Sequence, residues 1–243
     1  MRGPVNRHEL EDRVLGPGPV LLFDADDTLW ENNVLFERAI DDFCGWVARP
    51  GLDAAAVRRL LDDIERVNSA VYGYGGAVFL RSLVQCLEQV RQRPVTPAER
   101  RRLERLTEAV LDCRVEPIPE VVDTLTVLQQ RYPLVLVTKG DVVEQWRKLD
   151  RSGLKGHFRG VHVVREKTTA VYTWLSERYG LSPEATWMVG NSPASDIVPA
   201  LAAGMGAVYV PNDNTWVLEH AELDTTAERL VTVERFGQLL DHF

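Results

Sequence analysis

The sequence predicts an α/β protein with a doubly wound, Rossmann-like parallel sheet that is interrupted early by an α-helical domain. From about residue 114 onward, short apolar runs alternate with helical patterns, which is typical of a parallel sheet with helices on both faces. Residues 31–113 instead contain several apolar stripes at helical spacing and no convincing strand. We therefore expect a core domain formed by residues 1–30 and 114–243, with residues 31–113 inserted as a helical domain.

Five apolar runs are the expected strands of the sheet. The first, PVLLFD at 19–24, begins at a proline, is apolar and has no helical period. Similar runs follow at 134–138 (LVLVT), 160–164 (GVHVV), 186–190 (TWMVG) and 206–210 (GAVYV). Helical patterns separate the later runs, and glycines at 153, 180 and 204 mark where three of these helices end.

The insert is expected to contain four helices. Thr96, Pro97 and Glu99 form a strong start signal for the fourth, with a cap, a first-turn proline and a capping box. The stretch VYGYGGAVFL, at 71–80, interrupts the helical region with glycines. Two interpretations fit this stretch equally well: a helix–helix connection, or a loop that faces a substrate through Tyr72 or Tyr74.

Composition narrows the classes of function. The net charge of −8 over 243 residues argues against nucleic acid or an anionic membrane as the main partner. The chain has no apolar stretch of roughly 18 residues and no signal-like apolar region, so we expect a cytoplasmic protein. Three distant cysteines and five histidines lack the spacing of a disulfide framework or a zinc site. A small anionic molecule remains compatible as a partner, and the oligomeric state is not indicated.

Polar groups follow four of the expected strands, and ligands of open parallel sheets bind beyond such strand ends. Asp24 and Asp26 follow the first strand, and residues two apart on an extended chain point the same way, so we expect them in one pocket. Thr138, Lys167 and the loop GNSPASD at 190–196 follow three others. These side chains are therefore the candidate site.

The candidate side chains suit phosphoryl transfer. A carboxylate beside a divalent cation can attack phosphorus and form an aspartyl phosphate. A second carboxyl group can protonate the leaving oxygen and then deprotonate the attacking water. Oxygen ligands select Mg²⁺, while a hydroxyl, an ammonium group and helix N-terminal amides can hold phosphate oxygens.

In these motifs the chain resembles the haloacid dehalogenase-like (HAD) hydrolases, specifically phosphatase-type members with a helical cap after the first strand. DADDT, at 24–28, is similar to the first motif, Asp-x-Asp-x-Thr. Thr138, Lys167 and GNSPASD are similar to the second, third and fourth motifs, in the family's order. The resemblance covers about residues 19–243.

The resemblance implies a Mg²⁺-dependent phosphatase that hydrolyses a small phosphorylated metabolite through an aspartyl-phosphate intermediate. It implies that Asp24 is the nucleophile and Asp26 the general acid and base, with Thr28 orienting the acid/base residue. Thr138 and Lys167 would bind the phosphate, and residues 31–113 would be the cap. The metal ligands that it implies are Asp24, Asp26 through its carbonyl oxygen, Asn191 and Asp196.

The chain departs from the family pattern at two positions. Asp27 stands where many relatives have glycine, and we interpret it as a turn or capping residue. Asn191 stands where the family most often has aspartate, so we hypothesise that magnesium binds more weakly than in relatives with the full acid. Trp30 follows the first motif and is a further candidate for facing the substrate, with Tyr72 and Tyr74.

Three other functions stay open. A phosphomutase or phosphotransferase would use the same motifs. A 2-haloacid dehalogenase is disfavoured, because the resemblance implies that dehalogenases lack the second aspartate, here Asp26. A catalytically silent binding module is disfavoured by the complete set of motifs, although Asn191 leaves room for it.

Overall fold

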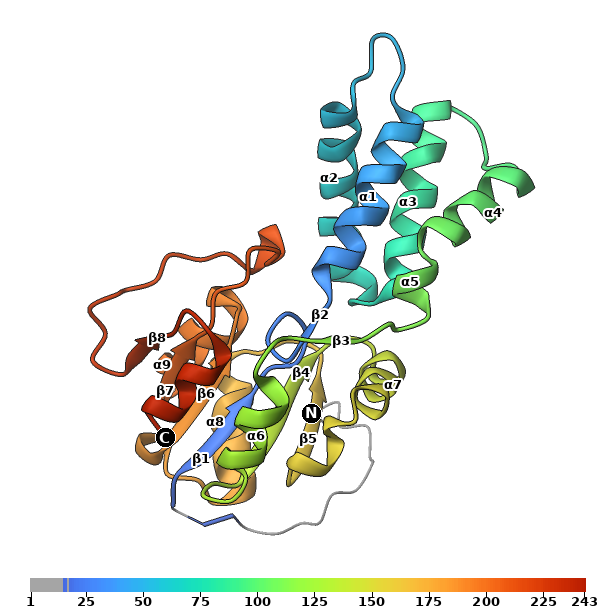
Figure 1. Ribbon diagram of the computed structural model, residues 1–243. Helices are drawn as coiled ribbons and strands as arrows, with labels where there is room; N and C mark the ends of the chain where they lie inside the picture. Colours follow the sequence, from blue (N-terminus) through green and yellow to red (C-terminus); the bar gives the residue numbers. More distant parts are fainter. Residues whose placement is uncertain (1–14, 17) are drawn as a thin grey trace. The chain divides into compact units, whose positions relative to one another are not determined.

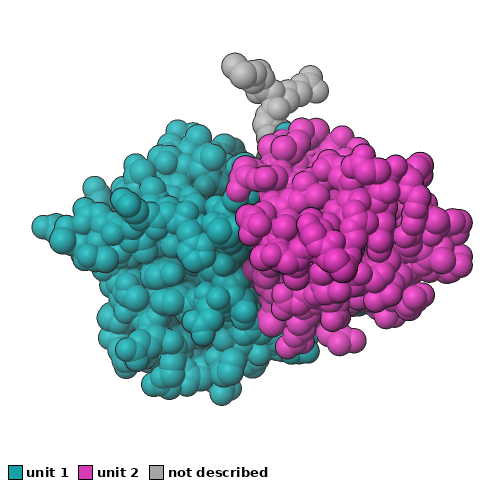
Figure 2. Space-filling view, turned by 90° about the horizontal axis from the view of Figure 1, so that it is seen from above, with its two compact units in different colours: residues 1–31, 115–243 teal, residues 32–114 magenta. Residues whose placement is uncertain are grey.

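The chain divides into two compact units. The computed structural model describes residues 15, 16 and 18–243. One unit combines the segment up to Glu31 with the segment from Val115 onward, and the other is Asn32–Arg114 (Figure 2). We call them the core unit and the helical unit.

The core unit contains a six-stranded parallel sheet, which confirms the predicted α/β class (Figure 1). Its strand order is β5-β4-β1-β6-β7-β8, and every neighbouring pair is parallel. After β1 the chain adds β4 and β5 on one side, and it then crosses to the other side of β1 to add β6, β7 and β8. The strands are β1 (Val20–Phe23), β4 (Leu134–Lys139), β5 (Gly160–Val164), β6 (Thr186–Gly190), β7 (Gly206–Tyr209) and β8 (Leu230–Thr232).

All five expected strands are present, and β8 is an addition that the sequence did not indicate. β8 has only three residues, Leu230–Thr232, lies at the edge of the sheet and is at most half-buried, so its apolar run is shorter than those of the five expected strands. A further pair of short strands, β2 (Trp30–Glu31) and β3 (Glu116–Pro117), runs antiparallel where the chain leaves the core unit and returns to it.

Helices cover both faces of the sheet, as the doubly wound prediction requires. Alternate residues of β1 point to opposite faces. Leu21 and Phe23 pack in a cluster with Val121 of α6 and Leu149 of α7. Val20 and Leu22 pack in a second cluster with residues of α8 and α9, Tyr172 and Ala200 among them. The helices are α6 (Val121–Leu128), α7 (Val142–Ser152), α8 (Thr169–Tyr179) and α9 (Val198–Ala202).

Shorter helical turns complete the core unit. A π-helical turn, Pro193–Ile197, leads directly into α9. The 3₁₀ turns are Leu154–His157, Pro183–Ala185, Val217–Glu219 and Phe236–Asp241.

The register of the sheet brings three strand ends together. Phe23 of β1 pairs with Leu136 of β4 on one side and with Val189 of β6 on the other. The residues that follow these strands therefore meet at one edge of the sheet. The chain order reverses between β1 and β6, and such switch points are where open α/β sheets bind ligands.

The helical unit has a hydrophobic core of its own. Phe43, Leu61, Leu83 and Leu103, one from each of its four longer helices, lie fully buried in one cluster. The helices are α1 (Asn33–Val47), α2 (Ala54–Tyr72), α3 (Gly76–Arg91), α4 (Pro97–Leu106) and the short α5 (Glu108–Leu111). The predicted capping box of α4, between Thr96 and Glu99, is confirmed.

The three cysteines are buried thiols, and none of them forms a disulfide. Burial raises the pKa of Cys44 to about 11 and that of Cys86 to about 12, so both stay protonated and pack as small apolar side chains. Among the described residues, no helix combines the length and the apolar character that crossing a bilayer would need.

A pH-dependent loss of stability follows from His162, which joins β5 to α8 through a hydrogen bond between its Nε2 and the Tyr179 hydroxyl. Burial and the nearby Arg178 cation lower the pKa of His162 from 6.5 to about 4. As the pH falls from 6.5 toward 4, the unfolded chain takes up a proton that the folded protein does not, so the free energy of unfolding decreases.

We expect His162→Gln to lose about 2 kcal/mol less stability than the wild type between pH 7 and pH 4.5, as measured by urea unfolding. The exposed His242 is the matched control, and His242→Gln should follow the wild-type profile. Equal losses in the wild type and His162→Gln would contradict this account.

Candidate active site

Asp24 lies directly beyond the end of β1, between a lysine and a threonine. Its backbone N–H donates to the Val189 carbonyl at 2.9 Å, which extends the pairing of β1 with β6. Lys167 Nζ donates to Asp24 Oδ1, and Thr28 Oγ1 lies 3.0 Å from Oδ2. Both oxygens of this buried carboxylate are therefore held by side chains.

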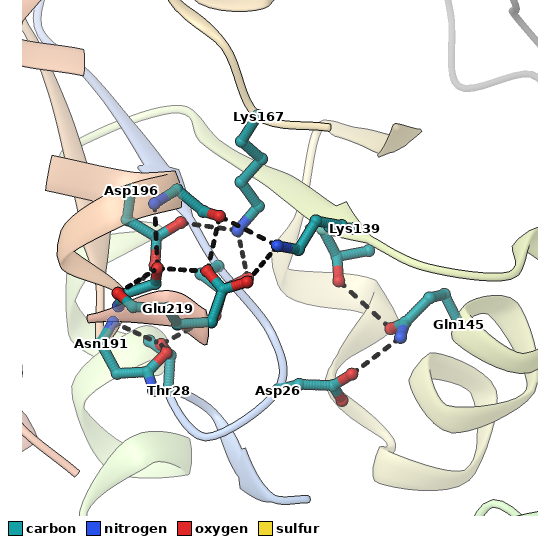
Figure 3. Close-up of polar contacts among 12 residues, drawn as sticks. Asp26, Thr28, Lys139, Gln145, Lys167, Asn191, Asp196 and Glu219 are labelled. Atoms are coloured by element: carbon teal, nitrogen blue, oxygen red, sulfur yellow. Dashed lines mark hydrogen bonds and ion pairs between the residues drawn. The ribbon is translucent and has the colours of Figure 1, made fainter. Parts of the chain in front are cut away.

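Lys167 also contacts a second carboxylate. Its Nζ donates to Asp196 Oδ1 at 2.6 Å, and both side chains are buried (Figure 3). Burial opposes the charge on Lys167, but Asp196 and Asp24 outweigh it and raise the pKa of the ammonium group. Burial raises the pKa of Asp196 to about 7, against the opposing effect of Lys167. One ammonium group thus faces two carboxylates, and the surplus negative charge is what burial penalises.

The loop after β6 depends on a glycine to bring Asp196 this close. A Cβ on Gly190 would lie 2.2 Å from Asp196 Oδ2, so any side chain there would displace the carboxylate. Asp196 Oδ2 accepts from the backbone N–H of Ser192 at 3.0 Å, within the turn that begins the π-helical segment. The loop therefore points its acidic residue back toward β1.

Asn191 shares Thr28 with Asp24. Its Oδ1 lies 3.2 Å from Thr28 Oγ1, and its backbone N–H donates to that same hydroxyl at 3.1 Å. Its Nδ2 donates to Thr215 Oγ1 at 2.9 Å. Thr28 was expected to orient Asp26, but its hydroxyl lies between Asp24 and Asn191 instead.

The predicted metal ligands are of the right chemical type, since carboxylate and amide oxygens are what Mg²⁺ takes in proteins. Asp24 Oδ2 and Asn191 Oδ1 converge on one hydroxyl, whereas both Asp196 oxygens are held by Lys167 and Ser192. Across residues 15, 16 and 18–243, no group of three His, Cys, Asp or Glu side chains has the arrangement of a metal site. The magnesium ligand set stays a prediction.

Asp26 is turned toward a different set of partners from Asp24. Trp30 Nε1 donates to its Oδ1 at 2.7 Å, and Gln145 Nε2 donates to its Oδ2 at 2.8 Å. Lys148 Nζ lies 2.9 Å from both oxygens. In Figure 3 the carboxylate points toward Gln145 and away from the Lys167–Asp196 pair. The expectation that Asp24 and Asp26 point into one pocket is therefore not met in this orientation.

Thr138 ends the buried part of β4, and its hydroxyl donates to Gln145 Oε1 at 3.2 Å. Gln145 belongs to α7, whose first turn is capped by Asp141. Gly140 has a φ of +144°, and a Cβ there would lie 3.0 Å from Gln145 Nε2. The glycine thus permits both the turn between β4 and α7 and the approach of the glutamine.

A fourth carboxylate, Glu219, enters the site from the 3₁₀ turn between β7 and β8. It pairs with Lys139 and accepts from the Ser192 and Ser195 hydroxyls. Burial would raise the pKa of Glu219, but Lys139 and the two hydroxyls hold it below its ordinary value. Lys139 Nζ also lies 3.0 Å from Ser195 Oγ, so Lys139 joins the end of β4 to the segment after β6.

Sequence reasoning did not identify Gln145, Lys148 and Glu219. Gln145 and Lys148 lie three positions apart on α7, directly after the predicted second motif, and that spacing was the available signal. Glu219 carried no signal, because it lies in a segment that matches no motif.

The three substrate-facing candidates lie in different environments. Trp30 is 0% exposed and packs in the core unit, so the expectation that it faces a substrate is wrong. Tyr72 ends α2 and is 51% exposed, and its hydroxyl accepts from Arg81 at 2.9 Å. Tyr74 lies in the short connection from α2 to α3, and a substrate role for both tyrosines stays a prediction.

Asp27 is a turn residue, as interpreted from the sequence. Its φ is +62°, a region that favours glycine, and its backbone N–H donates to the Trp30 carbonyl at 2.8 Å. Its own carbonyl accepts from Asn212 Nδ2 at 3.1 Å. The turn places Trp30 against Asp26.

Along most of its length the chain is similar to proteins that are named as phosphatases or nucleotidases. It is 26% identical to a glyceraldehyde 3-phosphate phosphatase of Methanopyrus kandleri, over 91% of this chain and 95% of that protein. It is 25% identical to the pyrimidine 5'-nucleotidase YjjG of Escherichia coli, over 78% of this chain and 84% of that protein.

Solved structures have the same fold. A haloacid dehalogenase-like family hydrolase from Xanthomonas campestris superimposes with a TM-score of 0.79 at 25% identity, over 93% of this chain and 95% of that one. The HAD hydrolase YfnB of Bacillus subtilis, bound to magnesium, superimposes with a TM-score of 0.64 at 18% identity, over 93% and 98%.

The family profile of the haloacid dehalogenase-like hydrolases matches residues 19–204, which is most of the core unit and all of the helical unit. This range includes every one of the four motifs. The chain therefore belongs to the haloacid dehalogenase-like hydrolase family.

Proposed function

We propose that the protein is a Mg²⁺-dependent phosphatase that hydrolyses a small phosphorylated metabolite through an aspartyl-phosphate intermediate. The observation that carries this proposal is the position of Asp24 at the sheet's switch point, held by Lys167 and Thr28. The names of the two similar proteins, a glyceraldehyde 3-phosphate phosphatase and a pyrimidine 5'-nucleotidase, support phosphate monoesters as the substrate class.

In the first half-reaction, an oxygen of Asp24 attacks phosphorus while the ester P–O bond breaks. The leaving alkoxide takes a proton from Asp26, so a neutral alcohol departs and Asp26 becomes a carboxylate. Lys167 and the Thr138 hydroxyl hold the phosphate oxygens, where charge neutralisation supplies most of the acceleration.

In the second half-reaction, Asp26 removes a proton from water, which attacks the phosphorus of the aspartyl phosphate. The bond between Asp24 and phosphorus breaks, inorganic phosphate leaves, and both aspartates return to their starting states. The Ser192 backbone N–H and Lys167 hold Asp196 beside this centre.

Asp24, the Asp26 carbonyl oxygen, Asn191 and Asp196 would hold the Mg²⁺ ion. When bound, the ion would supply positive charge that offsets the negative charge of the carboxylates and the phosphate. We also propose that the helical unit is the cap that selects the leaving group. We propose further that the protein acts in the cytoplasm, which three buried cysteines outside any disulfide support.

Asp26 favours phosphatase over dehalogenase chemistry within this family. Displacement of a halide leaves an anion that needs no proton, so that reaction has no leaving group for a second carboxyl group to protonate. A phosphomutase would use the same groups, and it differs by returning the phosphoryl group to an acceptor instead of releasing phosphate.

Replacement of the nucleophile gives the direct test. We expect Asp24→Asn to lower phosphate release from glyceraldehyde 3-phosphate by more than about 10³-fold, because an amide oxygen cannot form the acyl phosphate. The measurement is inorganic phosphate released over a panel of phosphorylated metabolites with MgCl₂. Residual activity of Asp24→Asn near the wild-type level would refute the assignment, and phosphoryl return to an added alcohol would indicate a phosphotransferase.

Asn191 gives a test of the metal site. Asn191→Asp adds a negative charge beside Asp24, so we expect the dissociation constant for Mg²⁺ to fall by about tenfold. Titration calorimetry with MgCl₂ measures this without turnover. The matched control is Asn212→Asp, which changes an amide that binds the Asp27 carbonyl. Unchanged or weaker Mg²⁺ binding in Asn191→Asp would contradict the hypothesis.

A further inference from the structure

The Asp26 carboxylate is held by three donors, two of them from α7. Lys148 Nζ contacts both oxygens, Gln145 Nε2 contacts Oδ2, and Trp30 Nε1 contacts Oδ1. The Lys148 side chain is 8% exposed and its charge is met by Asp26, whose side chain is 20% exposed. Because three donors occupy its two oxygens, the carboxylate is held in the orientation of Figure 3.

Gln145 also joins Asp26 to the predicted phosphate-binding residue. Its Nε2 donates to Asp26 and its Oε1 accepts from the Thr138 hydroxyl at 3.2 Å. A threonine hydroxyl has a single hydrogen to donate. A phosphate oxygen that takes this hydrogen leaves the Gln145 oxygen without its donor, so the amide loses one of the two contacts that fix it.

The local sequence builds this arrangement. Gln145 and Lys148 lie three residues apart, so their side chains lie on the same face of α7. The helix begins just after Thr138, Lys139 and Gly140, which places that face against the end of β4. Any side chain at position 140 would crowd Gln145, whose Nε2 would lie 3.0 Å from the new Cβ.

We infer that Gln145 and Lys148 are positioning residues for Asp26: Lys148 holds the Asp26 side chain in the empty site, and Gln145 releases it when phosphate binds Thr138. This inference rests on the proposed function, in which Asp26 protonates the leaving group. Both residues act through the Asp26 carboxyl group, which is the group that transfers the proton. Their effect is to hold Asp26 within reach of the site and to couple its movement to an occupied phosphate position.

If Lys148 positions Asp26, its loss should affect two substrates to different degrees. Departure of an alkoxide from glyceraldehyde 3-phosphate needs a proton from a correctly placed Asp26, whereas p-nitrophenolate leaves without one. Lys148→Met should therefore lower kcat/KM for glyceraldehyde 3-phosphate by about 100-fold and for p-nitrophenyl phosphate by less than about threefold. Lys148→Arg keeps the charge and should restore most of the lost activity.

The comparison controls for folding, because an unfolded fraction lowers both rates equally. Lys155→Met is the matched control, since Lys155 is a surface lysine that pairs with the exposed Asp150. It should leave both kcat/KM values unchanged. Equal losses with the two esters in Lys148→Met, or an arginine variant no better than the methionine variant, would overturn the inference.

A spectroscopic measurement tests the same inference without turnover. The Trp30 indole N–H donates to Asp26, so its ¹H–¹⁵N resonance reports the position of that carboxylate. Trp30→Phe identifies the resonance among the six tryptophans. We expect it to shift in Lys148→Met, to return in Lys148→Arg, and to shift in the wild type on addition of orthovanadate with MgCl₂.

The kinetic and the spectroscopic measurements distinguish failure of the proposed function from failure of the positioning role of Lys148 and Gln145. If the wild type hydrolyses neither ester beyond the Asp24→Asn blank, the proposed function fails, and the Trp30 resonance still decides whether Lys148 positions Asp26. An unmoved resonance in Lys148→Met overturns the inference even in an active phosphatase. An unmoved resonance on addition of orthovanadate overturns the coupling through Gln145.

Discussion

The buried contact of Lys167 with Asp24 and Asp196 is the interaction on which the site depends. Two carboxylates buried side by side would repel each other and lose their hydration, which costs free energy unless a cation lies between them. Lys167 supplies that cation and is itself buried, so each partner requires the others. Removing the lysine would leave two uncompensated charges, whereas removing one carboxylate would still leave the ammonium group paired.

The same principle extends across the whole site. Four carboxylates, Asp24, Asp26, Asp196 and Glu219, face three lysines, and each lysine comes from a segment different from that of its partner. Among these seven groups the negative charges outnumber the positive ones by one, and the half-exposed Glu166, 3.9 Å from Lys139 Nζ, adds a further negative charge. An aspartate at position 191 would increase that deficit, so the neutral Asn191 keeps the resting site closer to balance while still offering an oxygen toward Thr28.

Topology explains why these groups meet. β1 lies between β4 and β6, so the residues after these strands share one edge of the sheet although they are far apart in the chain. Two glycines are also needed to place these side chains. Gly190 leaves room for Asp196, and Gly140 leaves room for Gln145. The turn through Asp27, with its positive φ, brings the Trp30 indole onto Asp26.

The sequence alone determined the α/β class, five strands of the sheet and the helical insert, because apolar periodicity and capping residues act over a few neighbouring positions. It also indicated Asp24, Thr138, Lys167 and Asp196, because strand ends must meet at one edge of a parallel sheet. Only the tertiary structure decided the partners: Gln145 and Lys148 lie 119 and 122 positions from Asp26, and Lys139 lies 80 from Glu219. Contacts at such separations depend on how helices pack on the sheet and how the last loop returns, which no local pattern encodes.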